Sequence, residues 1–450
     1  MRPGRWKRLI CTLALAWMLP GLARAQFMFD PANYTSLADP NTPDTIPAGT
    51  RITLQDWQRY RKFMPMALVA AFSQRYGFKI GNDPKYTINV GPTTPVAMFK
   101  QLRDNTEKYA GQTRLIQAAS GGYTMEGYVA GVPFPKPSGP LIAYQLLYNV
   151  WTYYFPSISY FDGSYTAVDR YRNRFYEQID VDQWRLSHSS DEGFSTNPAY
   201  GAGFMQATRM LVGAPEQERY TAQLALLPDD PEKVQEIYVF VPALRRSLRM
   251  SSAARCSPLL GSDFNQDDNS DGVFFQPPNF KATLLGTRKV LAVMHGDLNH
   301  WYGGDLDGGD QLYDRDGLPG WPSPTAATWE LRDVYILDLA PLPILGDYCY
   351  GHKVIFIDKE TFVQLYLDDY DDAGRLYKGQ LIWHTTISVN DHERYILRGH
   401  NPQTIIDWRN IHATTSLPNR APEINHLNHR EVSTHPELYA FPGGLAYILK

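Results

Sequence analysis

The sequence predicts an α+β protein built mainly from an antiparallel β-sheet in one large domain. From Asp169 onward, segments with an apolar–polar period of two follow one another with only short turns between them, and strands joined in this way pair antiparallel. One strongly apolar helix, Leu141–Phe155, precedes them, and no fixed-period repeat or low-complexity linker divides the 450-residue chain. We expect helices and loops over 26–140, the helix and meander over 141–400, and irregular chain over 401–450.

The first 25 residues have the pattern of a secretory signal peptide. Four basic residues within positions 2–8 precede an apolar run, Leu9–Leu19, and the triplet from Ala23 to Ala25 matches the A-x-A cleavage motif. The apolar run is shorter than the ~20 residues that a membrane span needs. We therefore expect cleavage after Ala25 and an exported, soluble protein of the periplasm.

Charge and cysteine content narrow the class of protein. Loss of the leader removes five basic residues and no acidic ones, which changes the net charge from −4 to −9. An acidic chain of this kind argues against a nucleic-acid-binding surface, which would be basic. Two cysteines then remain, Cys256 and Cys349, and two cysteines in an exported protein are expected to form a disulfide.

Shorter helices are expected before the main one. Thr53-Leu-Gln-Asp56 resembles a capping box at a helix start. A second helix is predicted over Met66–Tyr76, and a third from Thr94 to Tyr109.

The helix Leu141–Phe155 carries more apolar surface than a one-sided amphipathic helix needs. Its apolar stripe has spacings of three and four and consists of Leu141, Tyr144, Tyr148, Trp151 and Phe155. An ordinary core helix is the commoner explanation of such a stripe. The alternative is a helix that lies in the hollow of a curved sheet, where a lipid could displace it.

The stretch Ile237–Val241 is a β-branched and aromatic run without alternation, which indicates a strand buried on both faces. We expect it to line a hydrophobic ligand cavity together with the helix, through Tyr144, Tyr148, Trp151, Tyr238 and Phe240. Pro242 ends the strand. Rim or headgroup contacts are expected from Arg245, Arg246, Arg249 and Asp263, although the arginines could equally be charges that protect a strand end.

Further strands are predicted from period-two patterns. They cover a long strand starting at Asp169, then 219–227, 234–241, 281–293, 329–339, 353–357, 361–366 and 376–389.

Four blocks of the sequence resemble a bacterial family known as domain of unknown function 1329. They are Tyr238–Phe264 with its Arg-Cys-Ser-Pro and Gly-Ser-Asp-Phe elements, Tyr128–Pro135, Cys349–Glu360 and Ile405–Thr414. The family is similar to the periplasmic carriers that move lipoproteins to the outer membrane (LolA-like proteins). This resemblance implies a strongly curved antiparallel sheet, or half-barrel, with helices on its concave side. It implies no catalytic residue.

Acidic loops offer the strongest hint of a metal. Asp267, Asn269 and Asp271, followed by Gly272, match the first half of a calcium loop, but proline occupies position 278, where the bidentate Glu is expected. A second acidic loop spans 305–316. His426, His429 and His435 have no standard zinc spacing, so a polar surface is the better explanation.

No nucleophile elbow, zinc-protease motif, phosphate loop or dinucleotide motif is present in the sequence. The paired acids Asp368-Asp369 and Asp371-Asp372 could serve a glycosidase, but adjacent acids in turns are more often solvated. The sequence therefore favours a non-enzymatic periplasmic carrier or binding protein for a lipid-like molecule, without cofactor, in contact with membrane transport proteins. A secreted hydrolase that uses acidic-loop carboxylates or calcium, and a structural accessory of an outer-membrane complex, are the alternatives.

Overall fold

The computed structural model describes residues 27–35, 43–73, 87–96, 98–152, 158–171, 174–186, 203–251, 255–268, 272, 274–296, 327–390, 393–396, 401–418, 423–424 and 440–449. Its helices in these ranges include α2 (Ala32–Thr35), η1 (Trp57–Phe63), α3 (Met66–Phe72), α4 (Lys100–Lys108), α5 (Ile142–Trp151) and η10 (Pro442–Tyr447). None of the described helices is long and apolar enough to cross a membrane.

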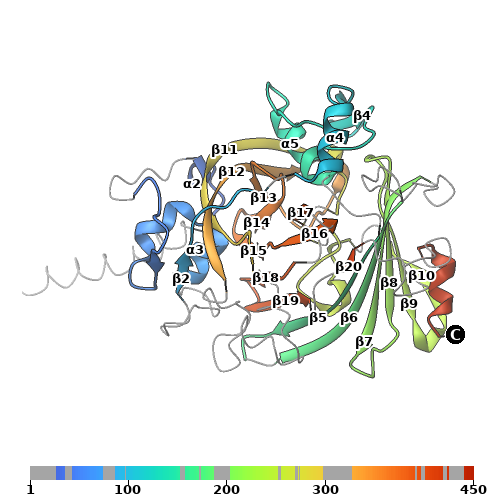
Figure 1. Cartoon of the computed structure of the whole chain (residues 1–450). Coiled ribbons are helices and arrows are strands. Elements are labelled where there is room, and N and C mark those ends of the chain that lie inside the picture. The colour runs from blue at the N-terminus through green and yellow to red at the C-terminus, as the bar shows by residue number, and fades with distance from the viewer. Residues whose placement is uncertain are drawn as a thin grey trace, which may run out of the picture.

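Sixteen strands of the described ranges join one large sheet (Figure 1). The first half of the sheet is β5 (Ile158–Val168), β6 (Arg174–Arg185), β7 (Phe204–Ala214), β8 (Ala222–Pro228), β9 (Glu236–Val241) and β10 (Arg246–Arg249). The second half is β11 (Phe280–Ala292), β12 (Thr328–Pro341), β13 (His352–Asp358), β14 (Gln364–Tyr370), β15 (Leu376–Ile382), β18 (Gln403–Asp407) and β19 (His412–Pro418). The short strands β1 (Arg51–Ile52), β2 (Ile88–Val90) and β20 (Glu423–Ile424) extend it.

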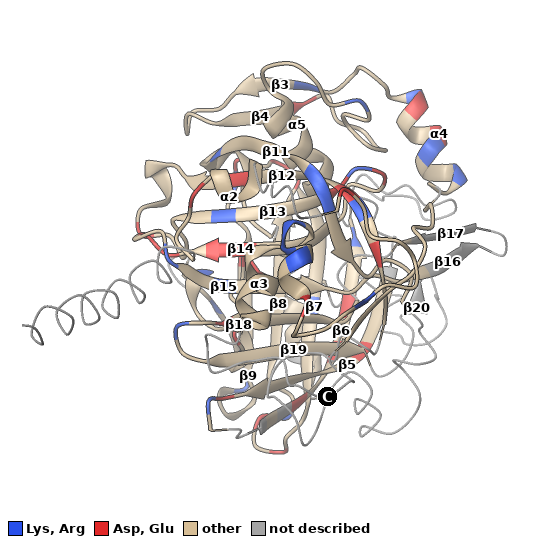
Figure 2. Ribbon diagram, turned by 90° about the vertical axis from the view of Figure 1, so that its left-hand side faces the viewer, with Lys and Arg blue, Asp and Glu red and all other residues tan. Residues whose placement is uncertain are grey.

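The sheet curls so that its two halves face each other across a hollow (Figures 1 and 2). All strand pairs within the sheet are antiparallel except β12 with β2. The halves join where β19 pairs with β5, with Ala413 opposite Val168. The predicted α+β class with a strongly curved, mainly antiparallel sheet is confirmed.

The inner face of the sheet is covered by α5 and by the segment 255–268. Tyr144 and Leu147 of α5 pack against Leu337 and Ile355 of the second half, while Tyr148 and Trp151 pack against Ile237 of the first half. The predicted position of this helix, on the concave face, therefore agrees with the structure. Below it, Leu259 and Phe264 pack against β5, β6 and β7.

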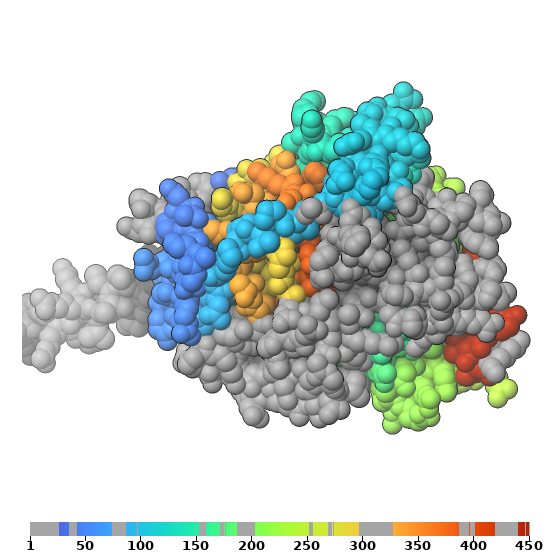
Figure 3. Space-filling model, viewed as in Figure 1, coloured from blue at the N-terminus to red at the C-terminus, as the bar shows by residue number. Residues whose placement is uncertain are grey.

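The outer face is covered by the two ends of the chain. The N-terminal elements η1 and α3 join the hydrophobic core on the outer side of β13–β15, and Figure 2 shows α3 in front of these strands. In the space-filling view, residues 87–96 and α4 continue from this region across the molecule toward α5 (Figure 3). At the other end of the sheet, η10 packs its Leu445 onto the outer side of β8 and β9.

Several element boundaries differ from the sequence predictions. The long strand predicted from Asp169 corresponds to β6 but begins later, at Arg174, because Asp169–Tyr171 belong to the turn after β5, a strand that the sequence did not predict. Residues 403–407 and 412–418, predicted to be irregular, form β18 and β19 at the centre of the sheet. The helix predicted from Thr94 begins at Lys100.

Candidate functional site in the hollow of the sheet

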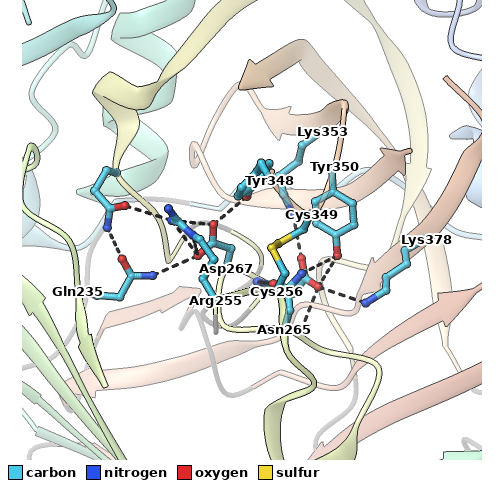
Figure 4. Close-up of a disulfide and its surroundings, with 12 residues drawn as sticks. Gln235, Arg255, Cys256, Asn265, Asp267, Tyr348, Cys349, Tyr350, Lys353 and Lys378 are labelled. Atoms are coloured by element: carbon cyan, nitrogen blue, oxygen red, sulfur yellow. Dashed lines mark hydrogen bonds and ion pairs between the residues drawn. A yellow bond between two sulfur atoms is a disulfide. The ribbon is translucent and has the colours of Figure 1, made fainter. Parts of the chain in front are cut away.

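A disulfide fixes the segment 255–268, which we call the plug segment, inside the hollow. Cys256 and Cys349 are bonded, with an S–S distance of 2.03 Å and a Cα–Cα distance of 5.3 Å. Cys349 lies just before β13, so the bond ties the plug segment to the second half of the sheet (Figure 4). The predicted disulfide is confirmed.

Asp268 of the plug segment is the centre of a buried ionic cluster. Its carboxylate accepts hydrogen bonds from Lys353 Nζ (3.0 Å) and from the Tyr350 hydroxyl (2.6 Å), and Lys378 Nζ lies 3.8 Å away. Lys353 also lies 3.3 Å from Asp369, and the side chains of Lys353, Asp268 and Asp369 are all inaccessible to solvent. Charges buried this deeply are stable only when they are paired and hydrogen-bonded.

Burial and the neighbouring lysines shift the pKa values of the two carboxylates in the cluster. Burial alone would raise the pKa of Asp268, but Lys353 and Lys378 outweigh it and hold that pKa below its usual range. Burial raises the pKa of Asp369 to about 7, against the attraction of Lys353. Asp268 is therefore the permanent anion of the cluster, and Asp369 is the group that takes up a proton first.

Asp267 binds the plug segment to the first half of the sheet. Its carboxylate accepts hydrogen bonds from Arg255 Nη2 (3.1 Å), the Tyr348 hydroxyl (2.8 Å) and Gln235 Nε2 (3.1 Å). Gln235, which lies beside Asp267 in Figure 4, directly precedes β9. Gln266 forms an amide pair with Gln223 of β8, so the plug segment spans the hollow from one half to the other.

The hydrogen bonds of Asp267 are relevant to the predicted calcium site, because Asp267 is one of its expected ligands. Both oxygens of Asp267 are already occupied by donors of the protein. Asn269 and Asp271, the other predicted ligands, lie outside the described residues, as do the second acidic loop, the three histidines from His426 to His435, and Ala23 and Ala25 of the leader. Calcium binding at this loop stays a prediction.

A cavity of about 230 Å³ lies between the inner face of β8–β9 and the plug segment. Most of its wall is apolar, and Ser257 and the two paired glutamines supply its polar part. The lining residues are Gln223, Ile237, Val239, Met250, Ser257, Pro258, Leu260, Gly261 and Gln266. Leu260 has a left-handed backbone (φ 49°), a strained conformation for a residue with a side chain, and it turns the plug segment over this cavity.

The five residues predicted to share one ligand cavity are divided between the two faces of the sheet. Tyr144, Tyr148 and Trp151 lie on the inner side in packed hydrophobic core, and Trp151 Nε1 donates to the Phe275 carbonyl (3.1 Å). Tyr238 and Phe240 lie on the outer side, against η10. The expectation of a single cavity is corrected because residues at even and odd positions of β9 point to opposite faces.

The predicted rim residues are also separated. The register pairs Arg246 with Val241, on the same face as Val239 and the cavity, whereas Arg249 pairs with Tyr238 on the outer face and contacts Glu236 (2.9 Å). Arg245 forms the turn between β9 and β10. Asp263 does not lie at a rim: its carboxylate accepts a hydrogen bond from Thr414 Oγ1 (2.7 Å) and contacts His412 Nδ1 (2.5 Å), which fixes the plug segment to β19.

The strand Ile237–Val241 was predicted to line a cavity, and its residues Ile237 and Val239 do so, but the other lining residues and the lysines of the ionic cluster were not identified from the sequence. Lys353 carries a usable signal, since a lysine next to the apolar run Val354–Ile357 must either reach solvent or find a buried anion. The cavity residues Gln223, Pro258 and Gln266 carry no such signal, because their common position depends on contacts between distant segments.

Comparison with known proteins identifies the family. No curated protein matches the chain. Among solved structures, a DUF1329 family protein from Desulfovibrio piger is 13% identical, with a TM-score of 0.46, over 68% of this chain and 100% of that one. A domain from Vibrio parahaemolyticus described as outer membrane lipoprotein-sorting is 14% identical (TM-score 0.42; 63% and 92% covered), and a LolA superfamily protein from Nitrosomonas europaea is 13% identical (TM-score 0.36; 63% and 94% covered). The family described as protein of unknown function (DUF1329) matches residues 51–435, and the chain therefore belongs to the DUF1329 family.

Proposed function

We propose that this protein is a non-enzymatic carrier or binding protein for a hydrophobic ligand, exported to the periplasm and working between membranes. The observation that carries the proposal is the cavity between β8–β9 and the plug segment. Five of its lining residues, Ile237, Val239, Met250, Pro258 and Leu260, are apolar. Ligand sites in proteins are typically concave and mostly apolar, with a few placed polar groups.

The size of the cavity defines what it accepts. A volume of about 230 Å³ is below the range of roughly 300–1,000 Å³ that accommodates a complete drug-sized ligand, and above the roughly 150 Å³ that holds a benzene ring. The cavity therefore suits one end of an alkyl chain or a single ring. A larger ligand needs the plug segment or α5 to move away from the inner face.

The hydrolase alternative depends on carboxylates of the acidic loop. Asp267 and Asp268 are both fully buried and bound to Arg255 and Lys353 respectively. Carboxylates in such pairs position the plug segment, so we assign them a structural role. The accessory alternative predicts a protein without bound ligand, and it is decided by the same experiment as the main proposal.

The test is mass spectrometry of organic extracts from protein purified without detergent. Wild type is compared with Val239→Trp, which fills the cavity, and with Val234→Trp, which adds the same volume at a valine that is 45% exposed and outside the cavity. We expect a lipid-like compound to accompany wild type and Val234→Trp, and several-fold less of it to accompany Val239→Trp. Melting temperatures of the three proteins show whether Val239→Trp is folded.

Two results would overturn the proposal. Ligand-free wild-type protein from native cells favours the structural accessory. Equal ligand content in wild type and a folded Val239→Trp places any bound compound elsewhere.

A further inference from the structure

Arg185, at the end of β6, is a buried cation that has no counterion among the described residues. Its side chain is 4% exposed, and its Nε and Nη1 are buried without a hydrogen-bond partner. Throughout the described ranges, no carboxylate forms an ion pair with it, and no other arginine has two buried, unpartnered guanidinium nitrogens. Arginine keeps its charge at every accessible pH, so its burial without an anion is strongly unfavourable.

The neighbouring strand shows how this protein pairs a buried arginine. Arg209 of β7 is 3% exposed, and its Nη2 lies 2.5 Å from Asp182 Oδ2 on the adjacent strand. Asp182 and Trp184 alternate with Gln183 and Arg185 along β6, and Trp184 packs in the outer core. Arg209 thus has its anion on the outer face, whereas Arg185 lies on the inner face of the same sheet, where no described carboxylate pairs with it.

Other polar groups surround Arg185 on the inner face. Gln183 is 2% exposed, and its amide oxygen has no donor. The register places Gln206 opposite Arg185 and Thr208 opposite Gln183, and these two are hydrogen-bonded to each other (3.1 Å). Burial raises the pKa of the Tyr128 hydroxyl, while the charge of Arg185 and hydrogen bonds from Thr152 and Arg185 oppose that rise, which places Tyr128 and the end of α5 beside the guanidinium.

Gln183, beside Arg185, and the cavity residue Ile237 lie on one line that crosses neighbouring strands of the inner face. Gln183 is opposite Thr208, Thr208 is opposite Ala225, and Ala225 is opposite Ile237, which lines the cavity. Three strand spacings separate Gln183 from Ile237, about 14 Å. The residues between them, Thr208 and Ala225, have small side chains. Tyr148 and Trp151 of α5 pack against Ala225 and Ile237, so an alkyl chain can follow this line only when α5 moves away from the inner face.

We infer that Arg185, with Gln183 and Tyr128, binds the anionic head of an amphiphilic ligand whose alkyl chain runs along the inner face toward the cavity. A carboxylate or phosphate monoester supplies the missing negative charge. Arginine is the preferred protein partner of both groups, because its guanidinium forms two parallel hydrogen bonds with them. A hydroxyl next to the anion would satisfy the Gln183 amide oxygen. This inference rests on the proposed carrier function and adds to it the chemical class of the ligand.

Calorimetric titration with four probes tests the inference: dodecanoate, dodecyl phosphate, the neutral dodecanol, and inorganic phosphate. Wild type is compared with Arg185→Met, which keeps the apolar part of the side chain, and with Arg185→Lys, which keeps the charge. Arg219→Met is the matched control, because Arg219 is exposed and pairs with Glu216 on the β7–β8 hairpin.

We expect wild type and Arg219→Met to bind an acidic amphiphile at least about ten-fold more tightly than dodecanol, as charge-assisted hydrogen bonds imply. Arg185→Met should lose that preference while it still binds dodecanol, and Arg185→Lys should recover part of it. Without ligand, Arg185→Met should melt at the same or a higher temperature than wild type, because it removes an unpaired buried charge.

Different failures have different meanings. Equal affinity of wild type for dodecanoate, dodecyl phosphate and dodecanol overturns the anion subsite and leaves the carrier function intact. Binding of none of the three alkyl compounds counts against both. Binding of inorganic phosphate alone, sensitive to Arg185→Met, overturns the link between the anion and an alkyl chain. A lower melting temperature of Arg185→Met, with unchanged preference among the probes, shows Arg185 to be structural.

Discussion

Asp368 and Asp369 are consecutive residues of β14, and both are fully buried, with their carboxylates on opposite faces of the sheet. Asp368 points outward and accepts hydrogen bonds from the backbone N–H groups of Met66 (2.8 Å) and Ala67 (2.7 Å) at the start of α3. Asp369 points inward, toward Lys353. One acid therefore holds the N-terminal helix on the outside, and the other belongs to the ionic cluster inside the hollow.

Removal of the Asp368 carboxylate should destabilise the N-terminal region. Asp368→Ala leaves two N–H groups of the first turn of α3 without an acceptor, and the loss of a helix cap costs about 0.5–2 kcal/mol. Urea unfolding should therefore show that the free energy of unfolding falls by about 0.5–2 kcal/mol or more. Asp372→Ala, at an exposed acid of the next turn, is the control and should change stability by less than about 0.5 kcal/mol. Equal effects of the two substitutions would contradict the capping role.

Asp369 should make stability depend on pH. Its pKa is raised by burial to about 7, above the value of about 3.9 in an unfolded chain, so the folded state binds the proton more tightly. Its contribution to stability is therefore largest at low pH and decreases as pH rises from about 4 to about 7, by at most ~1.4 kcal/mol per pH unit. Asp369→Asn, which resembles the protonated acid, should gain stability relative to wild type over this window. A constant difference in unfolding free energy between pH 5 and pH 8 would show that Asp369 does not titrate there.

His412 should give a pH dependence of the same direction in a different window. Its hydrogen bond with Asp263 raises its pKa above 6.5. The contact with Asp263 therefore stabilises the fold fully below about pH 6.5, and this contribution is lost as pH rises through the raised pKa. We expect His412→Gln to be less stable than wild type at pH 5.5 and to approach it at pH 9. If His412→Gln and Asp263→Asn act through the same contact, the double variant should lose less stability than the two single variants lose together.

The disulfide should contribute about 2–4 kcal/mol to stability. It links residues 93 positions apart, and its removal frees the unfolded chain while the plug segment keeps its ionic contacts. Chemical unfolding of the Cys256→Ser/Cys349→Ser variant measures the difference from wild type. An identical midpoint for the two proteins, or two titratable thiols in unfolded, unreduced wild type, would contradict the bond.

Trp151 should behave as a core residue. It is 4% exposed, packs between α5 and the first half of the sheet, and does not line the cavity. Trp151→Ala should lower the free energy of unfolding by about 3–5 kcal/mol, as large core truncations do. The ligand content of the folded variant, measured by the same extraction as above, should stay at the wild-type level. A loss of ligand greater than the loss of folded protein would place Trp151 in the binding site.

The sequence predicts those parts of the fold that depend on local periodicity. The apolar helix over α5 and most strands of the meander follow from spacings of three and four or of two. The strands β18 and β19 were missed because they are rich in Thr and other polar residues, such as Thr404 and Thr415, which hydrogen-bond to each other in the buried sheet (2.7 Å). A polar side chain satisfied by a distant strand looks, in the sequence, like a loop residue.

The site was harder to predict than the fold. The sequence indicated that Asp368 and Asp369 are solvated, and this is wrong because each faces a partner from a distant segment. Tyr238 and Phe240 were assigned to the cavity because nothing local shows that η10 covers the outer face of β9. Arg185 was not singled out, since only its burial without a described anion distinguishes it from the other described arginines.

The pairing of β5 with β19 determines when the sheet can be completed during synthesis, because the chain is made from its N-terminus onward. β5 is the first long strand of the sheet, yet its neighbour β19 becomes available only after residue 418 has emerged. Until then the hollow stays open on that side, and the apolar inner surface of β5–β8 is exposed to other chains. Such late closure predicts slow folding that benefits from a chaperone, and it makes truncation within 403–418 more damaging than loss of the same number of residues from an exposed turn.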